Sequence, residues 1–211
     1  ILSESGTRSC QSCHNPKLAF TDGLKTSISL KGTPLKRNSP SLTYSNFQHG
    51  QFWDMRREDL ESQSIDVITN KDEMHGSLEQ IIERLATNQY YENEFQNIFK
   101  TDSIKNWQIQ NALASYIRSL STFSSDFDRY LQGEKTALNK DQIAGFNLFV
   151  GKGKCATCHF MPLFNGTVPP DYVKTESEVL GTAVDGYNQI LSSDLGRGNI
   201  YTTISHTQRS F

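Results

Sequence analysis

The sequence predicts a mainly α-helical protein made of two lobes with long irregular loops and little β structure. Three observations lead to this prediction. Apolar residues recur with the helical period in several segments between residues 57 and 149. No stretch keeps the alternating pattern of a half-buried strand long enough to indicate a sheet. All the cysteines lie in two short motifs, which begin at Cys10 and Cys155, and this wide separation favours two lobes over one.

The first part of the chain is expected to form a long loop followed by a helix. The stretch Asn15–Gln51 is rich in Gly, Pro, Ser, Thr and Asn and has little helical period, which is typical of irregular structure. A helix is predicted over Arg57–Ile68, where apolar and small residues fall near one face. The residues of that face are Leu60, Ser64, Val67 and Ile68.

Three further helices are predicted in the middle of the chain. The run Ser77-Leu78-Glu79-Gln80 has the pattern of a capping box and opens a helix that continues through Ala86. A shorter helix is expected over Glu92–Phe99. The clearest pattern runs from about Ile104 to Thr122, and its apolar stripe is predicted to face the core. This stripe consists of Trp107, Ala112, Leu113, Tyr116, Ile117 and Leu120.

The second lobe is expected to begin at a short hinge. The run Gly133-Glu134-Lys135 is the best candidate for this hinge, so residues 1–132 are predicted as an N-terminal domain and residues 133–211 as a C-terminal domain. Asn139 precedes a predicted helix, Asp141–Phe149, which ends before a pair of glycines. Beyond the second cysteine motif, prolines and polar residues again predict irregular structure.

The motifs Cys10-Gln11-Ser12-Cys13-His14 and Cys155-Ala156-Thr157-Cys158-His159 use every cysteine in the chain. The pattern Cys-x-x-Cys-His is typical of covalent attachment of a c-type haem, in which two thiols add to the vinyl groups. The adjacent residues, His14 and His159, are then expected to coordinate the haem iron. A structural zinc site would give no role to these histidines, and a thioredoxin-like pair would not be expected twice. Disulfide pairing or chance is the remaining alternative. Two covalently bound haem c groups are therefore predicted, on Cys10, Cys13, Cys155 and Cys158.

Composition and charge argue against several classes of protein. The 211 residues carry 21 Lys and Arg against 23 Asp and Glu, and no basic run is present, which argues against nucleic-acid binding. No segment reaches the roughly 20 apolar residues of a membrane span. Apolar residues make up only 36% of the chain, and haem would supply part of the missing apolar core. The chain opens at Ile1-Leu2-Ser3-Glu4, so an export signal is expected to have been removed or not included.

The residues between the two motifs make the pattern specific. The runs Arg37-Asn38-Ser39-Pro40 and Phe52-Trp53-Asp54-Met55-Arg56, together with Glu73-Met74, resemble the bacterial di-haem cytochrome c peroxidases. They also resemble the di-haem oxidases of methylamine dehydrogenase maturation. The resemblance implies two cytochrome-c-like lobes, an N-terminal peroxidatic one and a C-terminal electron-transfer one, in the periplasm, where covalent haem attachment normally takes place. Because the family normally continues beyond the position of Phe211 with a helical segment, the C-terminal lobe is expected to be incomplete.

The resemblance implies roles for individual residues. Glu73 matches the distal acid that moves a proton as the O–O bond of peroxide breaks, and Gln63 matches a distal Gln of the family. Trp53 matches the Trp that couples the two haems electronically. Asn38 matches a ligand of the calcium ion that the family holds between its lobes, and an oxygen donor suits this hard cation.

The sequence departs from the family pattern at both iron sites. Members that need reductive activation have a capping His at a fixed distance after the first motif, and here that register gives Leu30, which cannot ligate iron. His49 and His75 lie outside this register but could approach the haem. The electron-accepting haem of the family takes a Met well downstream of the second motif, and no Met follows Met161. His206 is a candidate substitute ligand.

Three functions are compatible with these residues. The leading one is a peroxidase that reduces hydrogen peroxide to water. Its electrons would come from a small redox protein (a c-type cytochrome or a cupredoxin), enter at the His159 haem and pass by Trp53. The second is a di-haem oxidase that modifies a partner protein, a kind of enzyme that normally has no activating His, as here. The third is a di-haem electron carrier without catalysis. A homodimer is compatible with all three.

Overall fold

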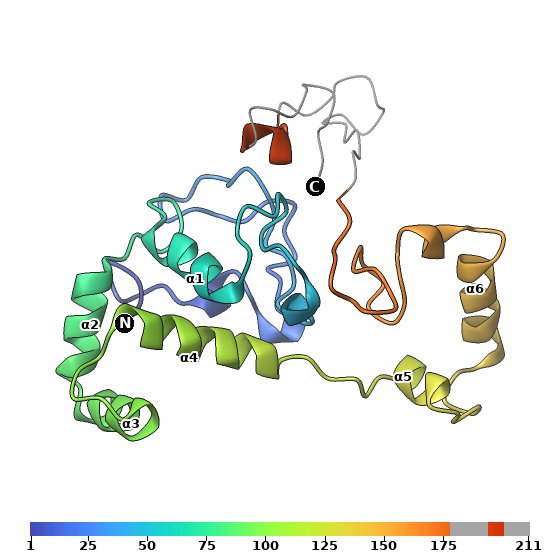
Figure 1. Cartoon of the computed structure of the whole chain (residues 1–211). Coiled ribbons are helices and arrows are strands. Elements are labelled where there is room, and N and C mark those ends of the chain that lie inside the picture. Colours follow the sequence, from blue (N-terminus) through green and yellow to red (C-terminus); the bar gives the residue numbers. More distant parts are fainter. Residues whose placement is uncertain (178–193, 201–211) are drawn as a thin grey trace. The chain divides into compact units, whose positions relative to one another are not determined.

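The structure, a computed structural model, describes residues 1–177 and 194–200 (Figure 1). Helices dominate this part of the chain and no sheet forms in it, since its β pairing consists of isolated bridges. The prediction of a mainly α-helical fold is confirmed. The helices are α1 (Leu60–Thr69), α2 (Leu78–Ala86), α3 (Gln89–Phe99), α4 (Asn106–Ser119), α5 (Asp126–Leu131) and α6 (Lys140–Val150).

The chain divides into two compact units. Unit 1 consists of Ile1–Asn46 and Gly50–Leu120, and unit 2 consists of Phe47–His49 and Ser121–Phe211. The border after Leu120 precedes α5, whereas the domain boundary expected from the sequence, after residue 132, follows α5. In this division α5 therefore belongs with α6 and the second cysteine motif.

Local capping and an apolar face explain the helices of unit 1. Asp59 begins α1 by accepting the N–H of Ser62 at 2.7 Å, and Ser77 begins α2 by accepting the N–H of Gln80 at 3.4 Å. Helix α1 packs against α4 (Figure 1). The core of the unit is a cluster of aliphatic side chains in which Ile81 is fully buried. Its buried members are Ile68, Ile81, Leu85, Ile104 and Ile109.

The face that α4 buries differs from the predicted stripe. Ile109 and Ala114 are buried, whereas Trp107 and Tyr116 are 46% and 58% exposed, so their assignment to the core was wrong. Trp107 instead packs edge-on against Phe99, with ring centroids 5.3 Å apart. The predicted stripe included two large aromatic residues, but smaller aliphatic residues of α4 fill the core.

A polar residue on the buried face of α4 explains this error. Gln108 is fully buried, and an apolar pattern cannot identify it. Its Oε1 accepts the backbone N–H of Lys105 at 2.8 Å, and its Nε2 donates to Thr101 Oγ1 at 2.7 Å. Because its amide is paired at both ends, Gln108 can be buried without a large penalty.

Capping also defines the helices of unit 2. Helix α5 was not predicted, although Ser125 and Asp128 form a reciprocal capping box, with N···O distances of 3.2 and 2.9 Å. Asn139 and Gln142 form another one at the start of α6, with distances of 2.9 and 2.8 Å. No residue of α6 is buried, although the helix carries several large apolar side chains. This helix therefore offers apolar surface to a further group.

The predicted irregular stretch, residues 15–51, contains only short 3₁₀ turns and isolated bridges. Hydroxyl groups inside it replace the hydrogen bonds of regular structure. Ser27 and Ser39 lie 2.6 Å apart, and Ser29 and Thr33 lie 2.8 Å apart. These contacts keep the loop folded without an apolar core of its own, as its composition led us to expect.

Candidate functional site

The two Cys-x-x-Cys-His motifs fold in the same way. Each begins with a 3₁₀ turn, over Cys10–Ser12 and Cys155–Thr157. In both, the carbonyl of the first cysteine accepts the N–H groups of the second cysteine and of the histidine. These distances are 3.1 and 2.8 Å in the motif of His14, and 3.2 and 3.0 Å in the motif of His159. The four cysteines are free thiols, and each pair is brought onto one turn.

A backbone carbonyl orients each motif histidine. Nδ1 of His14 lies 2.9 Å from the carbonyl oxygen of Phe20, and Nδ1 of His159 lies 3.1 Å from that of Phe164. A carbonyl oxygen can only accept, so Nδ1 carries the proton and donates it. The lone pair of Nε2 is then available to a metal, and the hydrogen bond fixes the orientation of the ring.

The same kind of loop presents both carbonyls. Phe20 and Phe164 have positive φ angles, +58° and +56°, which bulky residues rarely adopt. An antiparallel bridge closes each loop, at 15–21 in the first and 160–165 in the second. The carbonyl that accepts this hydrogen bond lies six residues after His14 but five after His159, so comparing the two sequences does not reveal the shared geometry.

Aromatic side chains surround the second motif. The ring of Phe149 lies 6.4 Å from that of His159 and 5.5 Å from that of Phe164, measured between centroids. The ring of Phe127 lies 5.1 Å from both Phe146 and Phe164. The cluster joins α5, α6 and the motif loop, yet it remains partly open to solvent. A large apolar cofactor would cover this surface.

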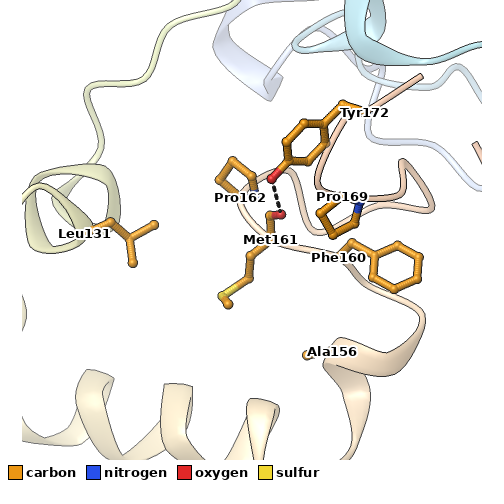
Figure 2. Close-up of a pocket in the computed structure, with 7 residues that line it drawn as sticks. All are labelled: Leu131, Ala156, Phe160, Met161, Pro162, Pro169 and Tyr172. Carbon is orange, nitrogen blue, oxygen red and sulfur yellow. Dashed lines mark hydrogen bonds between the residues drawn. The ribbon is translucent and has the colours of Figure 1, made fainter. Parts of the chain in front are cut away.

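A cavity of about 520 Å³ lies next to the second motif (Figure 2). Its lining includes Ala156 from the motif itself, Leu131 from the end of α5, and Met161 and Pro162 from the following loop. Tyr172 closes the lining by donating from its hydroxyl to the carbonyl of Met161 at 3.1 Å. The volume falls within the range of ligand cavities, about 300–1,000 Å³. The paired thiols, the anchored imidazole and the apolar surroundings all fit a c-type haem.

Glu73 lies in the loop that follows α1. Its Oε1 accepts a hydrogen bond from Nδ2 of Asn70 at 2.8 Å. Burial raises the pKa of Glu73 above its ordinary range, while the Arg56 cation, the Asn70 hydrogen bond and the Arg8 cation lower it in part. Nη2 of Arg8, whose charge acts on Glu73, lies 3.8 Å from Sγ of Cys13 in the first motif. A carboxyl with a raised pKa can hold and release a proton.

Leu30 lies beside the same loop. Its backbone N–H donates to the carbonyl of Asp72 at 2.9 Å, next to Glu73 in the chain. The structure therefore brings the position of the activating His close to the loop of the predicted distal acid. Gln63 lies early in α1 and is partly buried. Its expected role beside Glu73 stays a prediction.

The next residues are the other histidines proposed as iron ligands, two of which contact oxygen atoms of the protein. His49 Nε2 lies 2.6 Å from the carbonyl of Tyr172, so this nitrogen donates a proton and cannot ligate iron in this arrangement. His75 Nδ1 lies 2.9 Å from a carboxylate oxygen of Glu4. His206 lies outside the described residues.

A buried ion pair joins the two stretches on which the family resemblance depends. Asp54 is 5% exposed, and its oxygens lie 2.7 Å from Nη1 of Arg37 and 2.9 Å from Nη1 of Arg56. The indole Nε1 of Trp53 donates to the carbonyl of Asn38 at 3.1 Å. The side chain of Asn38 is exposed, and the described residues contain no cluster of three or more His, Cys, Asp or Glu that could hold a metal. Its calcium role stays a prediction.

Three groups that bond to candidate site residues were not predicted from the sequence: Asn70 and the carbonyls of Phe20 and Phe164. For Asn70 a local signal exists, because an Asn whose side chain accepts the N–H two residues later is a common turn former, as with Asp72 here. No signal marks the two carbonyls, since every residue has one and only the folded loop aims it at the imidazole.

The fold and the site define a mainly helical protein with two Cys-x-x-Cys-His motifs, a pattern typical of c-type haem attachment. A family model described as di-haem cytochrome c peroxidase matches residues 1–136. The chain belongs to this family, which confirms the resemblance seen in the sequence. Membership implies a c-type haem, and proteins of this family are typically periplasmic.

Relatives of two kinds are similar to the chain. Cytochrome c551 peroxidase of Nitrosomonas europaea is 38% identical over 166 residues, which cover 79% of this chain and 49% of the relative. Methylamine utilization protein MauG of Methylorubrum extorquens is 37% identical over 159 residues, which cover 75% of this chain and 45% of the relative. The chain thus spans about half the length of these proteins.

A solved structure is similar in fold to this chain. It is a MauG-like protein associated with microbial copper homeostasis, with a TM-score of 0.82 and 28% identity. The match covers 98% of this chain and 63% of that one. Within the part of the chain that the structure describes, no helix has the length and apolar character to cross a membrane.

Proposed function

We propose that the protein is a di-haem c-type peroxidase that reduces hydrogen peroxide to water. Each turnover converts one H₂O₂, two electrons and two protons into two waters. The observation that supports two haems is the common geometry of the two motifs, each with paired thiols and an imidazole anchored through Nδ1. When bound, haem iron would supply the peroxide site and the electron relay.

Glu73 is the proposed proton-transfer group. Its partial burial favours the protonated form, while the nearby cations Arg56 and Arg8 favour the carboxylate. A carboxyl balanced in this way can accept a proton from the inner oxygen of peroxide and return it to the outer oxygen. Gln63 would assist as a neutral hydrogen-bonding group early in α1.

Electron supply is assigned to the second motif. A small redox protein, a c-type cytochrome or a cupredoxin, would deliver electrons to the haem held by His159, and Trp53 would serve as the relay toward the haem held by His14. The indole is held in place by its hydrogen bond to Asn38, whose side chain is proposed to bind calcium. The periplasm is the proposed compartment, and a homodimer the proposed assembly.

One observation favours a second candidate, an oxidase that modifies a partner protein. Leu30 takes the register of the activating His, and an aliphatic side chain cannot cap the iron. The MauG relative is nearly as similar in sequence as the peroxidase relative. The two functions differ in the fate of the oxidising equivalents, which pass either to a small electron donor or to a partner protein.

Substitution of Glu73 tests the proposed function. In the full-length holoprotein, Glu73→Gln should slow the peroxide-dependent step by about 10²–10⁴-fold, the usual worth of a general acid–base group. Reduction of both haems should survive. The exposed Glu83→Gln, on α2, is the control and should turn over at the parent rate.

Trp53→Phe should have the opposite effect. Single-turnover kinetics should show a normal reaction with peroxide but slow transfer of electrons from the His159 haem.

If Glu73→Gln reduces peroxide as fast as the parent, the distal carboxylate is not Glu73 and the assignment is wrong.

A further inference from the structure

Asn70 organises the loop that carries Glu73. Its backbone N–H donates to the carbonyl of Asp66 at 3.0 Å and ends α1, and its carbonyl accepts the N–H groups of Glu73 at 3.1 Å and His75 at 2.9 Å. Its side-chain Oδ1 accepts the N–H of Asp72 at 3.0 Å. Its Nδ2 donates to Glu73 Oε1 at 2.8 Å. One residue thus sets both the path of the loop and a contact to the carboxyl.

The two side-chain contacts of Asn70 depend on one another. Because Oδ1 accepts from a backbone N–H, the amide cannot be turned over without losing that bond. Nδ2 is therefore the atom that faces Glu73, and it can only donate. A donor to a carboxyl oxygen stabilises the carboxylate form more than the protonated form.

We propose that Asn70 is a positioning residue for the proton-transfer step, holding the Glu73 carboxyl in one orientation and favouring its ionised form. This inference rests on the proposed role of Glu73. Among the described residues, the Asn70 amide provides the hydrogen bond to this carboxyl. The cations around it act only through their charge, since Arg56 is bonded to Asp54 at 2.9 Å and Arg8 to the carbonyl of Ile28.

The charges that face Glu73 set the background for this hydrogen bond. Arg56 and Arg8 lower the pKa of the carboxyl, while burial and the nearby Asp66 raise it. Loss of the Asn70 donor should therefore raise the pKa of Glu73 further. The fraction of carboxylate, the form that accepts the first proton, would fall on the acidic side of the pH profile.

Two substitutions separate positioning from a purely structural role. Asn70→Ser and Asn70→Asp both keep an acceptor for the N–H of Asp72, so both can form the turn. Ser is too short to reach Glu73 and adds no charge, while Asp replaces the donor with a repelling carboxylate. The positioning role predicts that the rate falls in the order Asn, Ser, Asp. A structural role predicts the order Asn, Asp, Ser, because Asp is the better turn former.

The measurements are made on the full-length holoprotein. For Asn70→Ser we expect the peroxide-dependent step to slow about tenfold, with the acid limb of its pH profile moved up by about one pH unit, as for a lost charge-assisted hydrogen bond. Asn70→Asp should slow this step more, and move the acid limb further, than Asn70→Ser does. Infrared titration of the carboxyl band that Glu73→Gln removes should show the same upward shift without any turnover.

Asn88 provides the matched control. Its Oδ1 accepts the N–H of Tyr90, two residues on, at 3.1 Å, and no carboxylate of the described residues bonds to its side chain. Asn88→Ser and Asn88→Asp should leave the pH profile unchanged. If Asn70→Asp matches the parent in rate and infrared titration while Glu73→Gln is slow, Asn70 has no positioning role. If Glu73→Gln is itself as fast as the parent, the proposed function of Glu73 fails instead.

Discussion

Replacement of Asp54 by Asn should weaken unit 1 more than the loss of any exposed ion pair. Asp54 is 5% exposed and accepts hydrogen bonds from Arg37 at 2.7 Å and from Arg56 at 2.9 and 3.2 Å. Asn keeps the shape and one acceptor oxygen but removes the negative charge. Two guanidinium groups would then share a site with no carboxylate between them.

The cost of this substitution follows from the burial of the three groups. Breaking a fully buried pair costs about 3–5 kcal/mol, and exposed pairs are worth about 0–1 kcal/mol. The side chain of Asp54 is only 7% exposed. The side chains of Arg37 and Arg56 are 22% and 32% exposed, so water can solvate part of the charge of each guanidinium group. We therefore expect a loss of about 2 kcal/mol in the free energy of unfolding.

Urea unfolding of the full-length holoprotein, followed by circular dichroism, measures this loss. Asp126→Asn is the control, because Asp126 also pairs with an arginine, Arg129, at 2.9 Å, but its side chain is 63% exposed. The control should lose no more than about 1 kcal/mol. If the two variants lose the same free energy of unfolding, burial does not strengthen the ion pairs of Asp54 and the prediction is wrong.

Three further predictions concern stability and cofactor content. Ile81→Ala should cost about 2–5 kcal/mol because Ile81 is fully buried in the core, whereas Ile98→Ala, at a residue 67% exposed, should be nearly neutral in the same unfolding assay. Hydrogen bonds from Ser62 lower the pKa of Asp59, so Asp59→Ala should cost about 1 kcal/mol above the ordinary pKa of Asp, about 3.9. The difference in free energy of unfolding between the parent and Asp59→Ala should vanish as the pH falls through the lowered pKa of Asp59 in the folded protein. A difference that stays constant with pH would contradict the capping role. Intact mass should exceed that of the polypeptide by two haem groups, and by one after loss of the thiols of the second motif; a single haem in the parent would rule out the di-haem proposal.

Much of the candidate site could be predicted because its signals are local. The attachment motif is five residues long, and its chemistry needs only thiols and an imidazole on one turn. The capping residues Ser77 and Asn139 likewise act within three residues, so the starts of α2 and α6 were expected within one or two positions. Helix α5 has an equally local signal at Ser125 and was missed because it is short.

Long-range contacts could not be predicted in this way. The pairing of Arg37 with Asp54, seventeen residues apart, depends on where a loop without periodicity turns back on itself. The buried face of α4 depends on Gln108, whose polar amide is paired by the neighbouring turn. Sequence periodicity records apolar character and carries no information about such pairing.

The sequence by itself determined that this chain is mainly helical, that its two Cys-x-x-Cys-His motifs are suited to c-type haem, and that it resembles the di-haem peroxidases. The first two conclusions follow from residue types at short, fixed spacings, and the resemblance depends on the runs around Asn38, Trp53 and Glu73. Only the tertiary structure decided that backbone carbonyls anchor His14 and His159 and that Asn70 holds the Glu73 carboxyl. The physical reason is that a hydrogen bond requires its donor and acceptor within about 3 Å of each other, and the folded loops alone bring them that close.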